Sequence, residues 1–257
     1  MKNIWKEKVL RGEPTVGTFV NTGNESTIEI ASMSDLDYVI IDTEHGPFDV
    51  ESTANMIRVM ELHDNTTLVR VKDSNRNSIL KMLDVGAKGL IIPQVHSVAQ
   101  VREIVEYGKY YPVGERGYAF ARAAGYGHAD HAKLGMLGYM EVSNRETLLI
   151  PQCETMGALE HIEEIAAMEG VDGIFIGPFD LSIAMGIPGQ FDDPRFKVAL
   201  VRVREACEAA GKICMIYCKN VEVARQRMAE GFRHPTVSCD YTHYFNALNQ
   251  AVHDVLA

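Results

Sequence analysis

The sequence lacks the features that mark several large classes of protein. No stretch approaches the roughly 18 apolar residues that a membrane-spanning helix needs, and the N-terminus has no apolar signal core before a small-residue cleavage site. Basic residues are in the minority, with 25 Lys and Arg against 35 Asp and Glu and a net charge of −10. Such a surface repels phosphate groups, which argues against nucleic acid or an anionic membrane as a partner. We therefore expect a cytoplasmic protein.

Cysteine is scarce, and a dinucleotide-binding signature is missing. The five cysteines include no CxxC pair, and an odd number in a cytosolic chain indicates reduced thiols, mostly in the core. No GxGxxG follows any apolar run. A doubly wound dinucleotide-binding sheet, the alternative fold, therefore has no positive support.

What the sequence does contain is a recurring series of short, β-branched apolar runs. Of the 257 residues, 46% are hydrophobic, enough to bury a large core. Runs that are apolar throughout are typical of strands buried on both faces, as in a parallel sheet. The predicted strands cover residues 16–20, 38–42, 67–71, 89–93, 148–152, 173–177, 213–217 and 235–239.

Longer amphipathic stretches separate these runs. One begins at Ser97 and another ends before Gly211, residue types that satisfy the free backbone groups of helix ends. Eight strands alternating with helices in a chain of this length favour a (β/α)8 TIM barrel over an open sheet. We expect a single barrel domain over residues 1–257 with an inserted region at about 111–146, a length typical of a functional loop or an extra subdomain.

Polar side chains collect where the predicted strands end. In a TIM barrel the catalytic residues lie at the C-terminal strand ends, all on one face. The residues concerned are Asp42, Glu44 and His45 after the second strand, Arg70 at the end of the third, Gln94 after the fourth, Gln152 and Glu154 after the fifth, and Asp180 after the sixth. The barrel would bring these side chains to one face.

Two of the carboxylates, Glu154 and Asp180, come from neighbouring strands. Oxygen donors without His or Cys alongside suit a hard ion such as Mg²⁺ or Mn²⁺, whose remaining ligands are water and substrate. The spacing is also compatible with each carboxylate capping the helix that follows it. His45 is either a structural histidine or a proton-transfer group, and the guanidinium of Arg70 needs an anion from the protein or from a substrate.

Other candidates have less support. Lys72, Lys88 and Lys219 are residues that a Schiff-base aldolase could use, but none stands clearly at an inward strand position. His128 and His131 have metal-like spacing but no third ligand nearby.

Five segments in order carry a specific resemblance. They are IDTEHGPFD (41–49), GAKGLIIPQV (86–95), YPVGERGYAFARAAGYG (111–127), LLIPQCET (148–155) and VDGIFIGPFDLSIAMG (171–186). Together they resemble the HpcH/HpaI family of metal-dependent class II pyruvate aldolases, which includes 4-hydroxy-2-oxoheptanedioate aldolase and 2-dehydro-3-deoxyglucarate aldolase. The similarity extends from about Val16 to the last helix.

The resemblance implies a TIM barrel of the phosphoenolpyruvate/pyruvate type. It implies a lyase that reversibly cleaves a 4-hydroxy-2-oxo acid to pyruvate and an aldehyde, in the catabolism of aromatic compounds or sugar acids. A divalent metal, Mg²⁺ or Mn²⁺ with Co²⁺ also compatible, would stabilise the pyruvate enolate. The implied site consists of His45 as the base, Arg70 as the enolate-stabilising residue, Glu154 and Asp180 as metal ligands, Gln152, Gly177 and Pro178 as substrate-binding residues, and Asp42 and Glu44 as supporting residues around His45 and the metal.

The resemblance also implies an assembly. Family members form trimers of dimers that exchange a C-terminal helix, so a homohexamer is expected, with the small-molecule 2-oxo acid and aldehyde as its other partners. The aldehyde is not identified, although Arg116 and Arg122 are candidates for binding the distal carboxylate of a dicarboxylate-derived substrate. Two other reactions on the same barrel stay open, decarboxylation of a 2-oxo acid and citrate-lyase-like cleavage of an acyl-CoA. A non-catalytic binding barrel is a further alternative.

Overall fold

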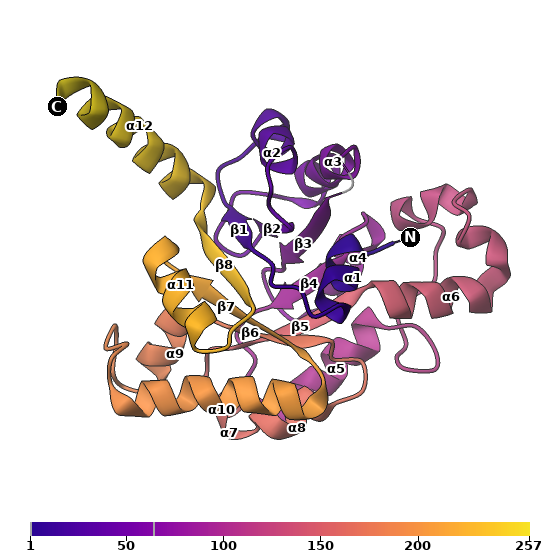
Figure 1. The fold of residues 1–257 in the computed structure, drawn as a ribbon. Coiled ribbons are helices and arrows are strands. Elements are labelled where there is room, and N and C mark those ends of the chain that lie inside the picture. The colour runs from indigo at the N-terminus through magenta and orange to yellow at the C-terminus, as the bar shows by residue number, and fades with distance from the viewer. Residues whose placement is uncertain (1, 64) are drawn as a thin grey trace.

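Eight parallel strands close into a barrel in which each strand pairs with its neighbours in chain order (Figure 1). The computed structural model describes residues 2–63 and 65–257. The bounds of the strands differ from the predicted ones by at most one residue, and the predicted (β/α)8 barrel is confirmed. The strands are β1 (Gly17–Val20), β2 (Tyr38–Asp42), β3 (Thr66–Arg70), β4 (Gly89–Ile92), β5 (Leu148–Cys153), β6 (Gly173–Ile176), β7 (Ile213–Cys218) and β8 (His234–Cys239).

Helices surround this barrel. Ser97 caps its helix by accepting a hydrogen bond from the backbone of Gln100, and Gly211 ends another in the left-handed conformation at φ 66°, as their positions predicted. The helices are α1 (Ile4–Leu10), α2 (Glu25–Ser32), α3 (Val50–Glu61), α4 (Arg76–Asp84), α5 (Val98–Gly108), α6 (Gly135–Glu146), α7 (Met156–Glu160), α8 (Ile162–Ala167), α9 (Pro178–Ala184), α10 (Pro194–Ala210), α11 (Val221–Ala229) and α12 (Asp240–Leu256), with 3₁₀ helices η1 (Arg122–Gly127) and η2 (Ala132–Leu134).

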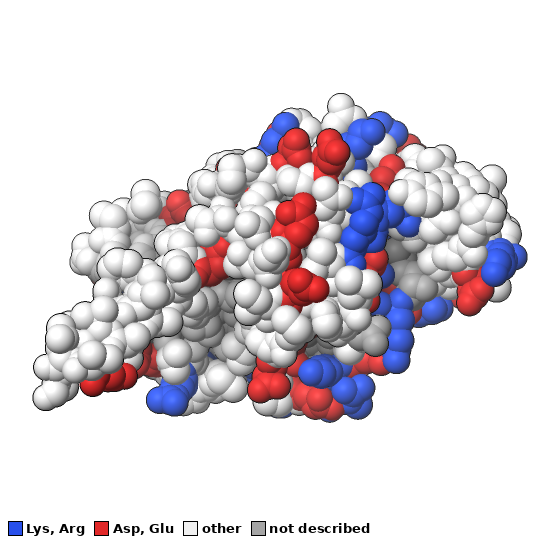
Figure 2. All heavy atoms as spheres, turned by 90° about the horizontal axis from the view of Figure 1, so that it is seen from above, with Lys and Arg blue, Asp and Glu red and all other residues white. Residues whose placement is uncertain are grey.

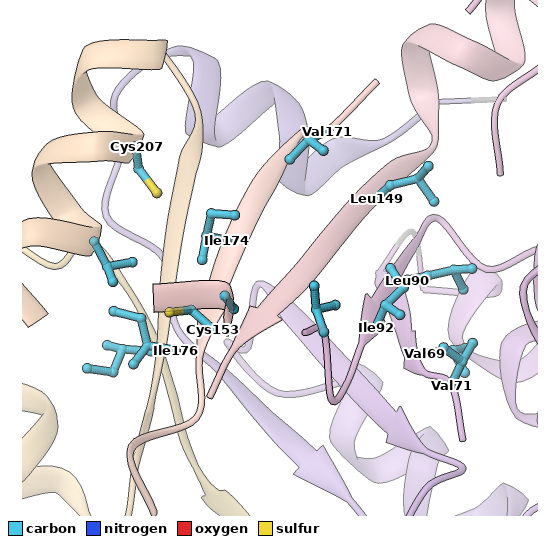
Figure 3. Packing of buried hydrophobic residues seen from close by; sticks show 14 of the residues in the cluster. Val69, Val71, Leu90, Ile92, Leu149, Cys153, Val171, Ile174, Ile176 and Cys207 are labelled. Atoms are coloured by element: carbon cyan, nitrogen blue, oxygen red, sulfur yellow. The ribbon is translucent and has the colours of Figure 1, made fainter. Parts of the chain in front are cut away.

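The strands divide their side chains between two apolar cores. Residues such as Val69, Leu90 and Ile174 point outward and pack against the helices, as Figure 3 shows. Alternate residues, among them Ile40 and Phe175, fill the barrel interior. Because strand side chains alternate in direction, a strand that is apolar throughout supplies both cores at once.

The N-terminal end of the barrel is closed by α1. Trp5 is fully buried there, with its ring centroid 4.7 Å from that of Tyr38. Its indole N–H donates to the hydroxyl of Thr15 at 2.8 Å, and that hydroxyl lies 2.8 Å from Nδ1 of the buried His234. This end is therefore filled by a hydrogen-bonded plug and leaves the opposite end open for a site.

The region at 111–146 connects α5 to β5 and contains η1, η2 and α6. Arg122 hydrogen-bonds to the carbonyl of Val85 and to Glu61, and Arg116 donates to Asp84 at 2.9 Å. These partners lie at the ends of α3 and α4, next to the starts of the strands that follow. The prediction that Arg116 or Arg122 binds a substrate in the site of the same chain is therefore wrong. Both side chains are engaged at the opposite end of the barrel from the C-terminal strand ends.

Two further expectations concern membrane-spanning helices and the state of the cysteines. None of the helices formed by residues 2–63 and 65–257 is long and apolar enough to cross a membrane. All five cysteines are free thiols, and four of them are buried, as expected for core residues.

Candidate active site

A polar layer covers the apolar interior at the C-terminal strand ends. Side chains two residues apart on a strand share a face. The residue two positions after the last inward apolar residue of a strand therefore also points toward the barrel axis. These residues are Asp42 after Ile40 on β2, Arg70 after Leu68 on β3, and Gln152 after Ile150 on β5. Three of the predicted site residues are therefore placed by strand geometry alone.

Asp42 and Arg70 form a two-point ion pair across β2 and β3. Asp42 is fully buried, and its two carboxylate oxygens accept from Nε and Nη2 of Arg70 at 2.9 and 2.6 Å. The side chain of Asn21 and the backbone N–H groups of Glu44 and His45 also donate to it. Burial opposes its ionisation, but Arg70 and the two backbone N–H groups outweigh that effect and hold the pKa of Asp42 below its usual value.

Glu44 lies between Arg70 and His45. Its Oε2 is 3.3 Å from Nη1 of Arg70 and 3.9 Å from Nε2 of His45. Burial raises the pKa of Glu44 against the opposing effect of Arg70, and the carboxylates of Asp42 and Asp180 add to the rise. The side chain of His45 is 68% exposed, so it reaches solvent at the rim while Glu44 stays below it.

Glu154 is 3% exposed and held by two glutamines. Its Oε1 accepts from the backbone and side chain of Gln94 at 2.8 and 3.1 Å, and its Oε2 accepts from the amide of Gln152. Burial raises its pKa to about 7 despite the Gln94 hydrogen bond, and Asp180 and Glu44 contribute to the rise. Thr155, not Glu154, caps α7 by accepting from Ala158. The capping interpretation of Glu154 is therefore wrong.

Asp180 and Gly177 belong to the start of α9. Asp180 is exposed in the first turn, a position that the helix dipole favours. Gly177 precedes it, and a Cβ at Gly177 would lie 2.5 Å from Oε2 of Glu154 and 3.0 Å from Nε2 of Gln152. Since the backbone of Gly177 has φ −95°, which any residue adopts, the close approach to Glu154 is what calls for glycine here.

An open cavity of about 230 Å³ lies here and is lined by Arg70, Gln152 and Asp180 among others. Asp42, Glu44 and Glu154 are not part of the lining but contact Arg70 or Gln152, which are. Six of the residues that line it are predicted from the sequence, and the rest come from other strand ends, from α9 and from α12. The lining comprises Phe19, Asn21, His45, Arg70, Gln152, Phe175, Gly177, Pro178, Phe179, Asp180, Tyr217, Cys239 and Tyr241. Phe19, Phe175 and Tyr217 could have been found by following the inward series of each strand to its end, whereas Gln94 gave no stronger signal than its place after β4.

The Schiff-base alternative finds no support in this cavity. None of the described residues that line it is a lysine. Lys88 is at the other end of the barrel, 3.8 Å from Glu61. Of the histidine pair, His131 is engaged elsewhere, since its Nε2 is 3.0 Å from the carbonyl of Ala123 and its ring stacks on Tyr139.

The donor set fits a hard divalent cation. Among the described residues, no group of three His, Cys, Asp or Glu side chains is arranged to hold a metal, but an ion that retains waters needs only one or two carboxylates. The carboxylate of Asp180 raises the pKa of both Glu44 and Glu154, Glu44 adds to the rise at Glu154, and Arg70 opposes the rise at both. Oε1 of Gln152 is buried without a hydrogen-bond partner in the described part of the chain. A cation beside Glu154 and Asp180 would relieve this excess of negative charge.

Comparison with known proteins gives concordant matches along the chain. Residues 15–247 match the family model described as HpcH/HpaI aldolase/citrate lyase. A 2-keto-3-deoxy-L-rhamnonate aldolase from Klebsiella pneumoniae is 31% identical over 97% of this chain and 92% of its own length. An HpcH/HpaI aldolase/citrate lyase family protein from Burkholderia cenocepacia superposes with a TM-score of 0.91 at 29% identity, covering 100% of both chains. The citrate synthase SbnG gives a TM-score of 0.85 at 28% identity over 97% and 96% of the two chains.

Proposed function

The chain belongs to the HpcH/HpaI aldolase/citrate lyase family and is a lyase, and from this premise we propose that it is a divalent-metal-dependent pyruvate aldolase. The reaction is the reversible cleavage of a 4-hydroxy-2-oxo acid to pyruvate and an aldehyde, in the cytosol. The observation that carries the proposal is that Asp180, Arg70 and Gln152 line one cavity, while Gln152 donates to the buried carboxylate of Glu154 and Asp42 holds Arg70 in place. Relatives are named for 2-keto-3-deoxy-L-rhamnonate, so the first aldehydes to test are those released by cleavage of deoxy sugar acids.

Glu154 and Asp180 are the residues that would hold the ion. When bound, the ion supplies positive charge that polarises the keto group of the 2-oxo acid. Mg²⁺ and Mn²⁺ match the oxygen donors best, and Co²⁺ is compatible. Gln94 and Gln152 fix the orientation of the Glu154 carboxylate, because each donates a hydrogen bond to one of its oxygens.

Arg70 stabilises charge that develops during cleavage. When the C3–C4 bond breaks, its electron pair forms the enolate of pyruvate, and negative charge moves onto the keto oxygen. Asp42 fixes Nε and Nη2 of Arg70, while Nη1 faces Glu44 at the cavity. A guanidinium fixed before the reaction lowers the barrier because it needs no reorientation as the charge develops.

His45 moves the proton. In cleavage it takes the proton of the C4 hydroxyl, and the carbon of the enolate is then protonated to give pyruvate. In the addition direction it takes the proton from the methyl group of pyruvate. A base of this kind is typically worth about 10²–10⁴-fold in rate. The carboxylate of pyruvate would lie at the start of α9, where Gly177 and Pro178 line the cavity and the first backbone N–H groups of the helix lack helical acceptors.

Chelation tests the function directly. Treatment with EDTA should abolish pyruvate release from a 4-hydroxy-2-oxo acid, and Mg²⁺ or Mn²⁺ should restore it. Full activity in the presence of chelator would contradict the proposal, and trapping of a pyruvate adduct by borohydride would favour a Schiff base instead. Because the chain is also similar to a citrate synthase, other reactions of 2-oxo acids remain alternatives. Release of CO₂ from oxaloacetate without an aldehyde product, or a requirement for an acyl-CoA, would identify those alternatives.

We further propose that α12 is exchanged between two copies of the chain. This helix projects from the barrel (Figure 1), and none of its residues is buried. Figure 2 shows it as an extension almost free of charged side chains. Its exposed apolar residues are Tyr241, Tyr244, Phe245, Leu248, Val252, Val255 and Leu256.

A matching groove lies on the outside of β1 and β8, where the last helix of a TIM barrel would pack. It has a volume of about 370 Å³ and is lined mainly by apolar residues, including Val16, Leu36, Val221 and Met228. His243 fixes the start of α12 beside this groove, because its Nε2 lies 3.1 Å from Thr18 and 3.0 Å from the carbonyl of Val237. Burial of both apolar surfaces by a second α12 supports a dimer, and three such dimers would form the expected hexamer.

A further inference from the structure

The plug formed by α1 leaves a cavity on one side of the N-terminal end of the barrel. The cavity has a volume of about 420 Å³, larger than the 230 Å³ of the candidate active site. Its walls come from α1 and from residues at or just before the starts of β5, β6, β7 and β8. Val9, Leu148 and Ile213 form apolar parts of the wall. No residue lines both cavities, so this one is separate from the candidate active site.

Two half-buried lysines line the cavity from different elements, Lys6 on α1 and Lys212 just before β7. Nζ of Lys6 donates to the carbonyl of Arg145, and Nζ of Lys212 donates to the carbonyl of Val171 at 2.6 Å. Neither ammonium group forms another hydrogen bond to a described residue. Since an ammonium group has three donors, the carbonyls anchor both groups and leave donors free for a ligand.

The third polar group of the wall is the ring of His234, which is 7% exposed. Its Nδ1 lies 2.8 Å from the hydroxyl of Thr15, whereas its Nε2 has no hydrogen-bond partner among the described residues. When Nδ1 accepts the hydroxyl proton, the ring proton of the neutral histidine is on Nε2. A buried donor of this kind calls for an acceptor, which a ligand in the cavity would supply.

The charges around the cavity have a positive excess. Asp172 lines it, but Oδ2 of Asp172 is already bound to Nζ of the buried Lys109 at 2.7 Å, while Oδ1 lies 3.9 Å from Nζ of Lys6. Burial lowers the pKa of Lys109 against the effect of Asp172, and Lys6 and Lys212 add to the fall. Three ammonium groups thus share one carboxylate, so an anion in the cavity would be attracted.

We propose that this cavity binds a phosphate monoester of a small, partly apolar molecule, with Lys6 and Lys212 on the phosphate group. Such a group carries about 1.5 to 2 negative charges near pH 7, which matches two ammonium groups, whereas a single carboxylate matches one. Its oxygens can also accept from Nε2 of His234, and the apolar walls suit its organic part. The inference does not depend on the aldolase reaction, because the two cavities share no residue.

Calorimetric titration of the full chain at pH 7.5 and low salt tests the proposal, with phenyl phosphate as the probe. Phenyl phosphate should bind, and inorganic phosphate should bind more weakly because it has no apolar part to bury. Lys6→Met and Lys212→Met should each weaken binding of phenyl phosphate about 3–10-fold, the range for one charged contact at a half-buried site. Lys212→Arg keeps the charge and should retain binding. Succinate bound as tightly as phenyl phosphate would overturn the ligand class.

Two control variants locate the binding. Lys2→Met removes a lysine whose side chain is 66% exposed, just before α1, and should leave the affinity unchanged. Arg70→Met removes a cation of the candidate active site and should also leave it unchanged. Phenyl phosphate should raise the Tm of the wild type more than that of Lys212→Met, and Tm without ligand shows that each variant folds.

Three results would overturn the proposal. Absence of binding to the wild type is the first. The second is an equal loss in Lys2→Met and Lys212→Met, which would mean that an adventitious anion is attracted by net charge alone. The third is binding that is lost in Arg70→Met but kept in Lys6→Met and Lys212→Met, which would place the phosphate in the candidate active site.

Discussion

Asp42 lies directly opposite Arg70 in the ladder between β2 and β3, and its carboxylate binds two nitrogens of the guanidinium. The register of two adjacent strands thus places the pair, and burial makes it strong. Its consequence for the site is that Arg70 presents Nη1 in a fixed direction, next to Glu44 and the cavity.

The first prediction concerns this pair. Asp42→Asn should lower the free energy of unfolding by about 3–5 kcal/mol, because it leaves a buried guanidinium without its main counter-ion. It should also lower kcat, since Arg70 loses its fixed orientation. In a double-mutant cycle with Arg70→Met, denaturant unfolding should show a double variant that is more stable than the sum of the single changes allows. Additive effects would show that the two residues do not act as a pair.

A second prediction concerns the base. His45→Gln keeps a polar side chain of similar length but cannot take a proton, so kcat should fall about 10²–10⁴-fold. Stability should hardly change, because the His45 side chain is 68% exposed. Steady-state kinetics and thermal unfolding measured on the same preparation check both parts, and turnover that survives the change would remove His45 from its assigned role.

Gly177 gives a third prediction. A methyl group at this position meets Oε2 of Glu154 at 2.5 Å, so Gly177→Ala should displace a carboxylate that Gln94 and Gln152 otherwise hold. We expect weaker Mg²⁺ or Mn²⁺ binding by calorimetry and a lower kcat/KM. The backbone of Gly177 already has φ −95°, so little folding strain is expected. Unchanged metal affinity would mean that Glu154 can move without loss of the site.

The fourth prediction is a pH dependence of stability set by His234. Burial lowers the pKa of His234 from 6.5 to about 4, and Arg233 adds to the effect. The Trp5 N–H donates to the Thr15 hydroxyl, whose own proton is then available for a hydrogen bond to Nδ1 of a neutral His234.

Above pH 6.5 the histidine is neutral in both the folded and the unfolded chain. As the pH falls from about 6.5 to about 4 only the unfolded chain takes up the proton, so stability is lost across this window, by up to about 3 kcal/mol. Below about pH 4 both states are protonated and the loss stops. Urea unfolding should show a smaller loss in His234→Gln, whereas the exposed His128→Gln should follow the wild type. Equal slopes in all three proteins would contradict the assignment.

The fifth prediction concerns assembly. Leu248→Glu places a charge on the apolar face of α12, and sedimentation should show dissociation of the dimer. Asn249→Glu changes the charge by the same amount one residue further along and should leave the assembly intact. Dissociation by both variants, or by neither, would argue against packing of the apolar face of α12 in a partner groove.

The sequence by itself determined the barrel and the end of it that carries the polar residues. Each of the eight apolar runs is recognisable from its own residues, because a strand that is buried on both faces is apolar throughout, whichever strands pair with it. Helix caps such as Ser97 likewise depend only on adjacent residues. The alternation of side chains along β2, β3 and β5 also predicts that Asp42, Arg70 and Gln152 follow inward apolar residues.

Only the tertiary structure decided which polar residues touch. Gln94 and Glu154 are 60 residues apart and meet because β4 and β5 are neighbours in a particular register. Arg116 and Arg122, candidates for binding a distal substrate carboxylate, lie at the opposite end of the barrel, because a sequence does not show at which face a long connection folds back. The contact between the rings of Phe179 on α9 and Tyr217 on β7 likewise joins segments that are distant in the sequence. Contacts of this kind follow from register and barrel closure, which are properties of the whole chain and not of any short segment.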